Sequence, residues 1–252
     1  MPITSVALLR AINLGGKNKL PMEDLIEMFV QAGCGNVRTY IQSGNVIFSA
    51  AKGASARLPG LIAAQISNRF GFKVPVVLRT AEEMGNVISN NPFLNRGVAE
   101  EELHVLFLAD LPAPPCVQDL DPDRSPPDAF EVRGQEVYLR LPNGVGRTKL
   151  TNQYFDSKLR TTSTGRNWRT VTTLFELMGG QAASQTVGAP LVGALLVYVP
   201  RSSLPGPKDT HKGCPYVGPQ AGTNNSLEQE ILLTRGLNRR SQYRRASQGA
   251  TP

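Results

Sequence analysis

The residues best suited to chemistry lie in a basic, glycine-containing segment near the start of the chain. They are Arg10, Asn13, Gly15, Gly16, Lys17 and Asn18. Two adjacent glycines allow main-chain N–H groups to turn towards a ligand, and the cationic side chains add positive charge around them. The segment lies between a predicted strand and a predicted helix, the position of a phosphate-binding loop. We therefore predict an anion site here; the alternative is a tight turn with solvated lysines.

This segment does not match an established nucleotide motif. The first glycine of the Walker A pattern G-x-x-x-x-G-K-[ST] is missing, and Asn18 stands where a Ser or Thr would hold magnesium. The dinucleotide pattern G-x-G-x-x-G does not match either. The segment therefore predicts affinity for an anion without identifying the ligand.

A second group of candidate residues surrounds a predicted turn. They are Arg38, Tyr40, Gln42, Ser43 and Asn45. Alternation along a strand places the first three side chains on one face. Such a row resembles the surface on which RNA-binding plaits stack bases, although the paired aromatic residues of that surface are missing. In the alternative interpretation, Tyr40 is a packing residue and residues 43–45 are only a turn.

The second half of the chain holds another basic glycine loop and the single tryptophan. The candidates in and after the loop PNGVGRTK are Arg147, Lys149 and Asn152. They could hold an anion before a predicted helix, with Thr148 as the helix cap. Arg166 and Trp168 begin the last predicted helix, where an arginine beside a tryptophan suits a stacked ligand. The alternative is a packing tryptophan preceded by an N-cap at Asn167.

Groups for covalent or acid–base chemistry are scarce. No Ser-His-Asp or Cys-His pattern is recognisable, and neither His104 nor His211 lies in a candidate loop. The cysteines Cys34, Cys116 and Cys214 are far apart and lack metal-ligand spacing. The sequence therefore predicts no metal site and no particular cofactor, and it favours anion binding over catalysis.

The composition is typical of a soluble globular chain, with 40% hydrophobic and 19% charged residues among 252. Residues 181–252 hold eight Lys and Arg against three Asp and Glu, which accounts for +5 of the formal charge of +7. The high pI is therefore weak evidence that the folded part binds nucleic acid. The start lacks a signal-peptide pattern, and no apolar run reaches the roughly 20 residues that span a bilayer. We expect a cytoplasmic protein without a membrane partner.

Hydrophobic patterning predicts six elements in the first eighty residues. They are a strand at 3–9, a helix after Pro21, strands at 37–42 and 45–49, a helix at 58–70 and a strand at 74–78. The order β-α-β-β-α-β is that of a ferredoxin-like plait. The first and third strands of a plait are central, so the loop after the first strand is expected near the turn at 43–44.

The remainder is predicted to be a looser α+β echo. Its elements are a helix at 80–89, a strand at 103–108, a proline-rich loop at 112–127 with one helical turn, a hairpin of 129–133 and 136–141, and helices at 150–159 and 168–178. We therefore predict an α+β fold with subdomains at 1–80 and 81–179. Residues 180–252 are predicted to be a low-complexity, disordered tail, whose basic run at 235–245 is either a nucleic-acid arm or a solvated segment.

Several segments together resemble one family. They are residues 7–22 (ALLRAINLGGKNKLPM), 36–46 (NVRTYIQSGNV), 72–77 (FKVPVV), 91–93 (NPF), 137–152 (VYLRLPNGVGRTKLTN) and 166–171 (RNWRTV). From about residue 3 to residue 178, the chain resembles the bacterial family called domain of unknown function 1697. The resemblance implies two α+β subdomains with ferredoxin-like topology and implies no activity.

One residue departs from the family pattern, which has Arg-Gly-Ile-Asn where this chain has Arg10-Ala-Ile-Asn13. The methyl group of Ala11 matters only if that residue needs a positive φ. The leading hypothesis is a protein that binds a phosphate-containing or nucleotide-like small molecule, with Lys17, Arg38 and Arg147 converging in one cleft. The alternatives are an RNA- or protein-binding module and an enzyme of unknown reaction.

Overall fold

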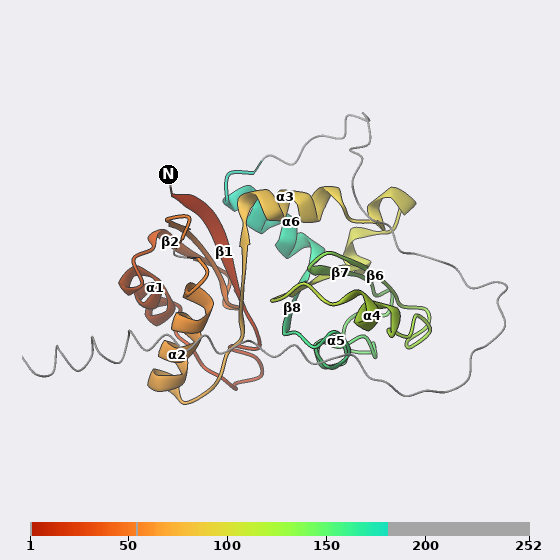
Figure 1. The fold of residues 1–252 in the computed structure, drawn as a ribbon, viewed down its shortest axis with the longest axis horizontal. Coiled ribbons are helices and arrows are strands. Elements are labelled where there is room, and N and C mark those ends of the chain that lie inside the picture. The colour runs from red at the N-terminus through yellow and green to blue at the C-terminus, as the bar shows by residue number, and fades with distance from the viewer. Residues whose placement is uncertain (1, 54, 181–252) are drawn as a thin grey trace, which may run out of the picture. The chain divides into compact units, whose positions relative to one another are not determined.

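The structure is a computed structural model that describes residues 2–53 and 55–180. Its first sheet is formed by the N-terminal part of the chain (Figure 1). Its strands are β1 (Ile3–Leu9), β2 (Gly35–Tyr40), β3 (Asn45–Ala50) and β4 (Val76–Thr80). They are antiparallel in the order β2-β3-β1-β4, so β1 and β3 are central as predicted. The edge position of β4 agrees with Pro75 directly before it, because proline cannot donate to a neighbouring strand.

Two helices cover one face of this sheet, α1 (Met22–Gln31) and α2 (Leu58–Phe70). Their buried residues, among them Phe29 and Ile62, pack with Ala7 and Leu9 of β1 in one hydrophobic cluster. Successive strand residues point to opposite faces, so Val6 and Leu8 lie on the other face and join a second cluster. The sheet is therefore covered on both faces.

The second sheet repeats the topology of the first. Its strands are β5 (Leu103–Leu108), β6 (Ala129–Arg133), β7 (Glu136–Arg140) and β8 (Ser163–Asn167), in the order β6-β7-β5-β8. Helix α4 (Pro114–Gln118) follows β5, and α5 (Asn152–Leu159) precedes β8. Phe130 of β6 contacts Phe155 of α5, with ring centroids 5.3 Å apart. The second half is thus a complete plait, closer to the first than the predicted looser echo.

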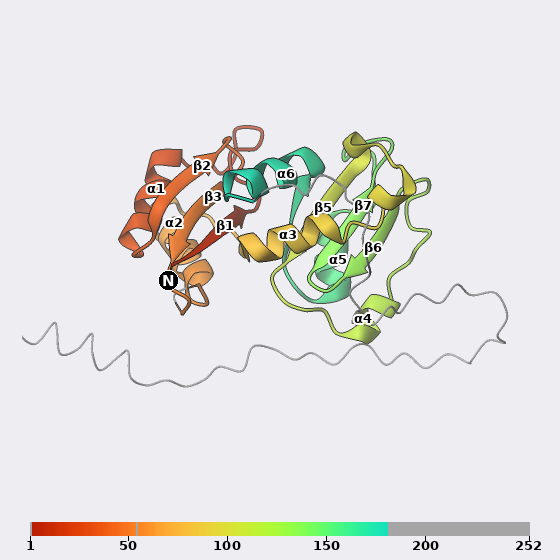
Figure 2. The ribbon, with the colours of Figure 1, turned by 90° about the horizontal axis from the view of Figure 1, so that it is seen from above.

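Two further helices follow the fourth strand of each plait, α3 (Ala81–Ser89) after β4 and α6 (Trp168–Leu177) after β8. They lie side by side, with α3 against β1 and β4 of the first sheet and α6 against β5 and β8 of the second (Figure 2). The second cluster joins Met84 of α3 and Leu174 of α6 to Val6 and Val105 of the two central strands. Short 3₁₀ turns at Leu94–Arg96 and Glu100–Glu102 lead into β5.

The register makes the repeat residue-specific. Val6 pairs with Ile47 and Arg79, and Val105 pairs with Tyr138 and Arg166. Arg79 therefore corresponds to Arg166, and the next residues, Thr80 and Asn167, are both N-caps. The Thr80 side chain accepts from the Glu83 N–H within a capping box, and that of Asn167 accepts from the Thr170 N–H. A strand, an arginine, a cap and a central helix occur twice in the same order.

Four details differ from the sequence predictions. Strand β8 was not predicted, and β4 lies two residues later than expected. Strand β2 ends at Tyr40 because Ile41 has a φ of 50°, which interrupts strand alternation before Gln42. Thr151, rather than Thr148, caps α5 by accepting from the Tyr154 N–H.

The predicted disordered tail after Gly180 and its basic run lie outside the described residues. Across residues 2–53 and 55–180, the helices are all too short or too polar to cross a bilayer. Candidate sites are therefore built from the two plaits and the helices that join them.

Candidate functional site

The first candidate side chain, Arg10, links the two plaits. It follows β1, and its guanidinium forms an ion pair with Asp156 of α5. Arg10 Nη1 also donates to the Ser163 carbonyl at 3.2 Å. The Asp156 carboxylate accepts from the Ser163 N–H at 2.8 Å and from its hydroxyl at 2.6 Å. Asn152 Nδ2 donates to the same hydroxyl at 2.9 Å, so Arg10 and Asn152, predicted in different loops, lie in one network.

Arg166 forms a second link, close to the first. Its Nε donates to Asn45 Oδ1 at 2.6 Å, and its Nη2 donates to the carbonyls of Leu9 at 2.9 Å, Ser43 at 3.3 Å and Gly44 at 3.4 Å. Its Nη1 donates to Gly165 O at 2.7 Å. We call Arg166, Asn45, Leu9 and Gly44 the Arg166 clamp. Its acceptors are all neutral, and burial lowers the pKa of the guanidinium to about 10, which leaves it charged at neutral pH.

The Arg166 clamp needs glycine in its turn. Gly44 has a φ of 77°, and a Cβ built there would lie 2.7 Å from Leu9 Cβ and 2.9 Å from Ile12 Cδ1. The Asn45 side chain stabilises the same turn by donating to Tyr40 O at 3.1 Å and Ser43 Oγ at 2.9 Å. Asn45 thus accepts from the arginine while it donates to the turn, which an amide can do and a carboxylate cannot.

The glycine segment after Arg10 is a small hairpin held by its own asparagines. Asn13 accepts from the Leu20 N–H at 2.8 Å and donates to Leu20 O at 3.0 Å and Gln42 O at 3.2 Å. Asn18 Nδ2 donates to Ala11 O at 3.0 Å. Gly15 and Gly16 have φ values of 55° and 77°, as a two-residue I′ turn requires, and the Lys17 N–H donates to Leu14 O across that turn. This main-chain donor is therefore already satisfied.

Ala11 has a φ of 56°, within the left-handed region. A residue with a side chain is strained in this region, so the methyl group of Ala11 carries a conformational cost. The loop keeps its course because Asn18 binds the Ala11 carbonyl and Ile12 is buried.

Arg38, Tyr40 and Gln42 do not form a common surface. Arg38 donates to the carbonyl of Leu177 at the C-terminal end of α6. Arg166 precedes the N-terminal end of α6, about 15 Å away along ten helical residues. Tyr40 packs against the central cluster. Because α3 and α6 cover this face of the sheet, a base could not stack there without displacing them.

The remaining candidates have separate environments. Arg147 is exposed in the loop before α5, and the main chain of Lys149 bonds to Ser125 Oγ and Arg124 Nε. Trp168 is 1% exposed and belongs to the central cluster, which favours the packing interpretation of the tryptophan over ligand stacking. Arg38 bonds to the far end of α6 and Arg147 lies in the loop before α5, so the convergence of Lys17, Arg38 and Arg147 in one cleft stays a prediction.

A matching link, missed by sequence reasoning, surrounds Arg79. Its Nε donates to Glu136 Oε1 at 2.8 Å, its Nη2 to Leu108 O at 2.8 Å and Gln135 O at 3.1 Å, and its Nη1 to Leu78 O at 2.7 Å. We call Arg79, Glu136, Leu108 and Gln135 the Arg79 clamp. Each contact corresponds to one made by Arg166. The available signal was the repeated arginine directly before a helix cap.

Charge distinguishes the two clamps. The Arg79 side chain is 5% exposed and forms an ion pair with Glu136, whereas no carboxylate within residues 2–53 and 55–180 forms an ion pair with Arg166. Burial raises the pKa of Glu136, and the adjacent Arg79 partly opposes this. The guanidinium charge is therefore neutralised by Glu136 in the Arg79 clamp, whereas the Arg166 clamp keeps its positive charge.

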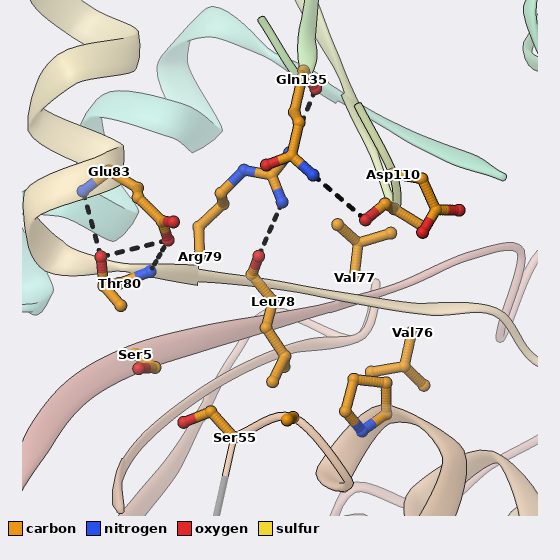
Figure 3. A pocket seen from close by; sticks show the side chains of 13 residues that line it. Ser5, Ser55, Val76, Val77, Leu78, Arg79, Thr80, Glu83, Asp110 and Gln135 are labelled. Carbon is orange, nitrogen blue, oxygen red and sulfur yellow. Dashed lines mark hydrogen bonds between the residues drawn. The ribbon is translucent and has the colours of Figure 1, made fainter. Parts of the chain in front are cut away.

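A cavity of about 460 Å³ lies beside Arg79, along the edge strand β4 (Figure 3). It is lined by Val76 and Leu78, by Glu83 at the start of α3, and by Asp110 after β5. None of these lining residues was a sequence candidate. No group of three His, Cys, Asp or Glu suited to a metal ion occurs in the described part of the chain.

Comparison with known proteins adds a family and a fold. No curated protein matches the chain. Among solved structures, that of the conserved bacterial protein SP0830 from Streptococcus pneumoniae is similar, with 20% sequence identity and a TM-score of 0.53 over 71% of this chain and 99% of that chain. At this identity the similarity concerns the fold alone. The model of the family described as protein of unknown function (DUF1697) matches residues 3–138, and the chain belongs to that family.

Proposed function

We propose that this chain is a cytoplasmic protein that binds a phosphate-bearing small molecule beside the Arg166 clamp. The observation that carries the proposal is the Arg166 guanidinium, which is charged, half-buried and bonded only to neutral acceptors. A cation held in this way creates a positive potential, and a nearby anion is stabilised in that potential. The guanidinium contributes through its field, because its donors are already used.

The groups that would touch the anion belong to the hairpin after β1. We call Arg10, Lys17 and Lys19 the basic loop. Asn18 Nδ2 donates to the Ala11 carbonyl, and the Asn13 N–H donates to the Asn18 carbonyl at 3.1 Å. These bonds join residues 11–13 to residue 18, so Arg10 and Lys19 follow each other closely in space at the base of the hairpin. The lysines are exposed. Among residues 2–53 and 55–180, Arg10 bonds through Nη1 to Asp156 and Ser163 and makes no bond through Nε or Nη2, which could donate to a ligand.

The expected affinity is modest. Each charge-assisted hydrogen bond contributes about 1.5–3 kcal/mol. Two or three such bonds, reduced by the cost of association, correspond to a dissociation constant between about a millimolar and a micromolar. Asp156 partly offsets the positive charge of Arg10, so the attraction must come mainly from Lys17, Lys19 and the field of Arg166, and it grows with the negative charge of the ligand.

Titration of the full chain with inorganic pyrophosphate tests the proposal. Lys19→Ala is expected to weaken binding about tenfold, the loss of one charge-assisted hydrogen bond. Lys52→Ala is the matched control, because Lys52 is an exposed lysine that follows β3 at the end opposite to Asn45. Equal affinity in the two variants would contradict the proposal. If ADP binds more tightly than pyrophosphate, the ligand class narrows to nucleotides.

A further inference from the structure

Strand β4 lies at the edge of the first sheet, and the cavity of about 460 Å³ follows this edge. The Arg10 N–H donates to the Pro75 carbonyl at 3.1 Å, so these two residues are hydrogen-bonded across the β1–β4 ladder. In an antiparallel ladder every second residue bonds to the partner strand, so the next such residue of β4 is Val77. The N–H and C=O groups of Val76 and Leu78 therefore point away from β1.

Two further contacts agree with this orientation of the main chain. The Leu78 carbonyl accepts from Arg79 Nη1 at 2.7 Å, and the Thr80 N–H donates to Glu83 Oε2 at 2.7 Å. Among residues 2–53 and 55–180, no group bonds to the N–H or C=O of Val76 or to the N–H of Leu78. The outer edge of β4 therefore offers two main-chain donors and one main-chain acceptor in a row.

The second plait has an equivalent edge, and there it is covered. Ser163 of β8 corresponds to Val76, because each pairs with the last residue of the central strand beside it. The Ser163 N–H donates to Asp156 Oδ1 at 2.8 Å, and its carbonyl accepts from Arg10 Nη1 at 3.2 Å. A side-chain acceptor and a side-chain donor thus complete the edge of β8. Proteins commonly protect edge strands, because an open edge is a template for another chain.

The first plait lacks this cover. Arg10 is the first residue after β1, whereas the first residue after β5 is Ala109. Ala109 lines the cavity, and its methyl group has no donor for the Val76 carbonyl. Within the described residues no carboxylate bonds to the Val76 N–H either. The cavity beside β4 thus corresponds to the space that Arg10 and Asp156 fill beside β8.

The walls of the cavity lie on both sides of the strand edge. Figure 3 shows Ser55 on one side of β4 and Asp110 and Gln135 on the other. Ala56 and Pro59, before and at the start of α2, add apolar surface to the first side. An extended chain placed beside β4 would therefore contact protein on both of its faces, because its side chains alternate between them.

Charge adds a preference for the sequence of such a chain. Arg79 lines the cavity, but its charge is paired with that of Glu136. Glu83 and Asp110 also line the cavity, and neither forms an ion pair within the described residues. The negative potential that remains favours a segment with basic side chains.

We infer that the edge of β4 binds an extended, basic segment of another protein as an added strand. One residue of the segment accepts from the Val76 N–H and donates to the Val76 carbonyl, and a residue two places away accepts from the Leu78 N–H. Pairing ends at Thr80, whose N–H is held by Glu83. The inference goes beyond the proposed anion site and shares none of its residues.

Amide hydrogen exchange of the full ¹⁵N-labelled chain tests whether the edge is open. The N–H groups of Val76 and Leu78 should exchange at least about tenfold faster than those of Val77 and Arg79, which bond to β1. The probe peptide acetyl-Lys-Val-Thr-Val-Lys-amide should slow the exchange of Val76 and Leu78. Protection of Val76 in the free chain would overturn the inference, because another part of this chain or a second copy would then already cover the edge.

Two N-methylated forms of the probe test whether its main chain makes the contact. In an added strand the N–H groups of alternate residues face β4. Methylation of the central threonine and methylation of both valines therefore block opposite edges of the peptide. One form should bind at least about tenfold more weakly than the other, since only one loses its bonds to β4. Equal affinity of the two forms would contradict the inference.

Ala109→Arg tests the site from the side of the protein. An arginine here stands as Arg10 does beside β8, can donate to the Val76 carbonyl, and should weaken binding of the probe at least about tenfold. Ala99→Arg is the control, because it adds the same charge at an exposed residue outside the cavity and should leave the affinity unchanged. Equal weakening by both substitutions would indicate only repulsion of a basic peptide and would contradict the inference.

Discussion

The Arg79 and Arg166 clamps occupy corresponding positions in two copies of one fold and differ most in the acceptor of the arginine Nε. Both arginines precede a helix cap, and each bonds to the last residue of the first strand in the other plait. The Nε partner is the carboxylate of Glu136 in one and the amide of Asn45 in the other. This exchange leaves one clamp neutral and the other positively charged.

The length of the adjacent turn explains the exchange. Strands β6 and β7 are joined by Gly134 and Gln135 alone, and the positive φ of Gly134 suits a two-residue turn that needs no side chain. Strands β2 and β3 are joined by four residues, which Asn45 stabilises by donating to Tyr40 O and Ser43 Oγ. The longer turn requires a donor at the first residue of β3, and Arg166 then forms no ion pair with a carboxylate of the described residues.

Removing each arginine is expected to have the largest effect. Arg79→Ala leaves the carboxylate of Glu136 without its cation and should lower the free energy of unfolding by about 3–5 kcal/mol. Arg166→Ala leaves only neutral groups unsatisfied and should cost less, about 1–3 kcal/mol. Urea denaturation of both variants measures the difference. An equal or larger loss for Arg166→Ala would show that the two clamps do not differ as described.

The two turns should respond differently to substitution by alanine. Gly44→Ala forces a Cβ against Leu9 and Ile12 at a positive φ and should destabilise the fold by about 1–3 kcal/mol. Its counterpart, Gln135→Ala, keeps the main-chain carbonyl that binds Arg79 and should change stability by less than about 0.5 kcal/mol. Thermal unfolding of the pair tests this, and similar melting temperatures would contradict it.

Exchanging the acceptors tests why they differ. Asn45→Asp gives Arg166 a carboxylate but removes the donors to Tyr40 and Ser43, and it should cost about 1–3 kcal/mol. Glu136→Gln keeps an acceptor for Arg79 Nε but leaves the buried guanidinium without its carboxylate, so it should also destabilise the fold, by up to about 3–5 kcal/mol. Chemical denaturation decides, and a stabilising Asn45→Asp would refute the explanation from turn length.

The fold was largely predictable from the sequence, because apolar side chains recur with the period of each element. The strand containing Val6 and Leu8 and the helix containing Ile62 and Ile66 begin and end where predicted. Strand β8 was missed because its residues, Ser-Thr-Gly-Arg-Asn, include no large apolar side chain. It is held by the ladder to β5 and by the contacts of Arg166, which only the folded chain brings together.

The candidate site was predictable only in part. Arg10, Asn45 and Arg166 were selected as polar residues in loops and turns, and they do lie together. Their partner Asp156 was missed because it lies 146 residues from Arg10 in a helix without an unusual pattern. The cavity along β4 has no sequence signal, since its walls come from strand, loop and helix residues that are individually ordinary.

Ala11 provides a smaller test on the Arg166 side. Ala11→Gly removes a methyl group at a φ of 56° and should stabilise the protein by up to about 1 kcal/mol, because glycine adopts this conformation without steric cost. Ala63→Gly, within helix α2, is the control and should destabilise by about 1 kcal/mol. A lower melting temperature for Ala11→Gly would show that the loop is not strained at this residue.

The smallest effect concerns the pH dependence of stability through His104 of β5. Burial lowers the pKa of His104, and the contact with the Glu102 carbonyl opposes this. The unfolded chain therefore takes up the proton first as the pH falls, so stability present above a pH of about 6.5 is lost below it. His104→Gln should flatten the difference in unfolding free energy between pH 7 and pH 5. If the unfolding free energy of His104→Gln depends on pH as strongly as that of the original chain, His104 does not cause the loss of stability.

The charge difference between the two clamps is tested most directly by titrating the ¹⁵N-labelled full chain with pyrophosphate. Pyrophosphate is expected to shift the amide resonances of Ala11, Asn18 and Lys19 beside the Arg166 clamp and to leave those of Leu78, Thr80 and Glu136 beside the Arg79 clamp unchanged. Equal shifts beside both clamps, or no saturable shift of the basic loop, would contradict the charge difference.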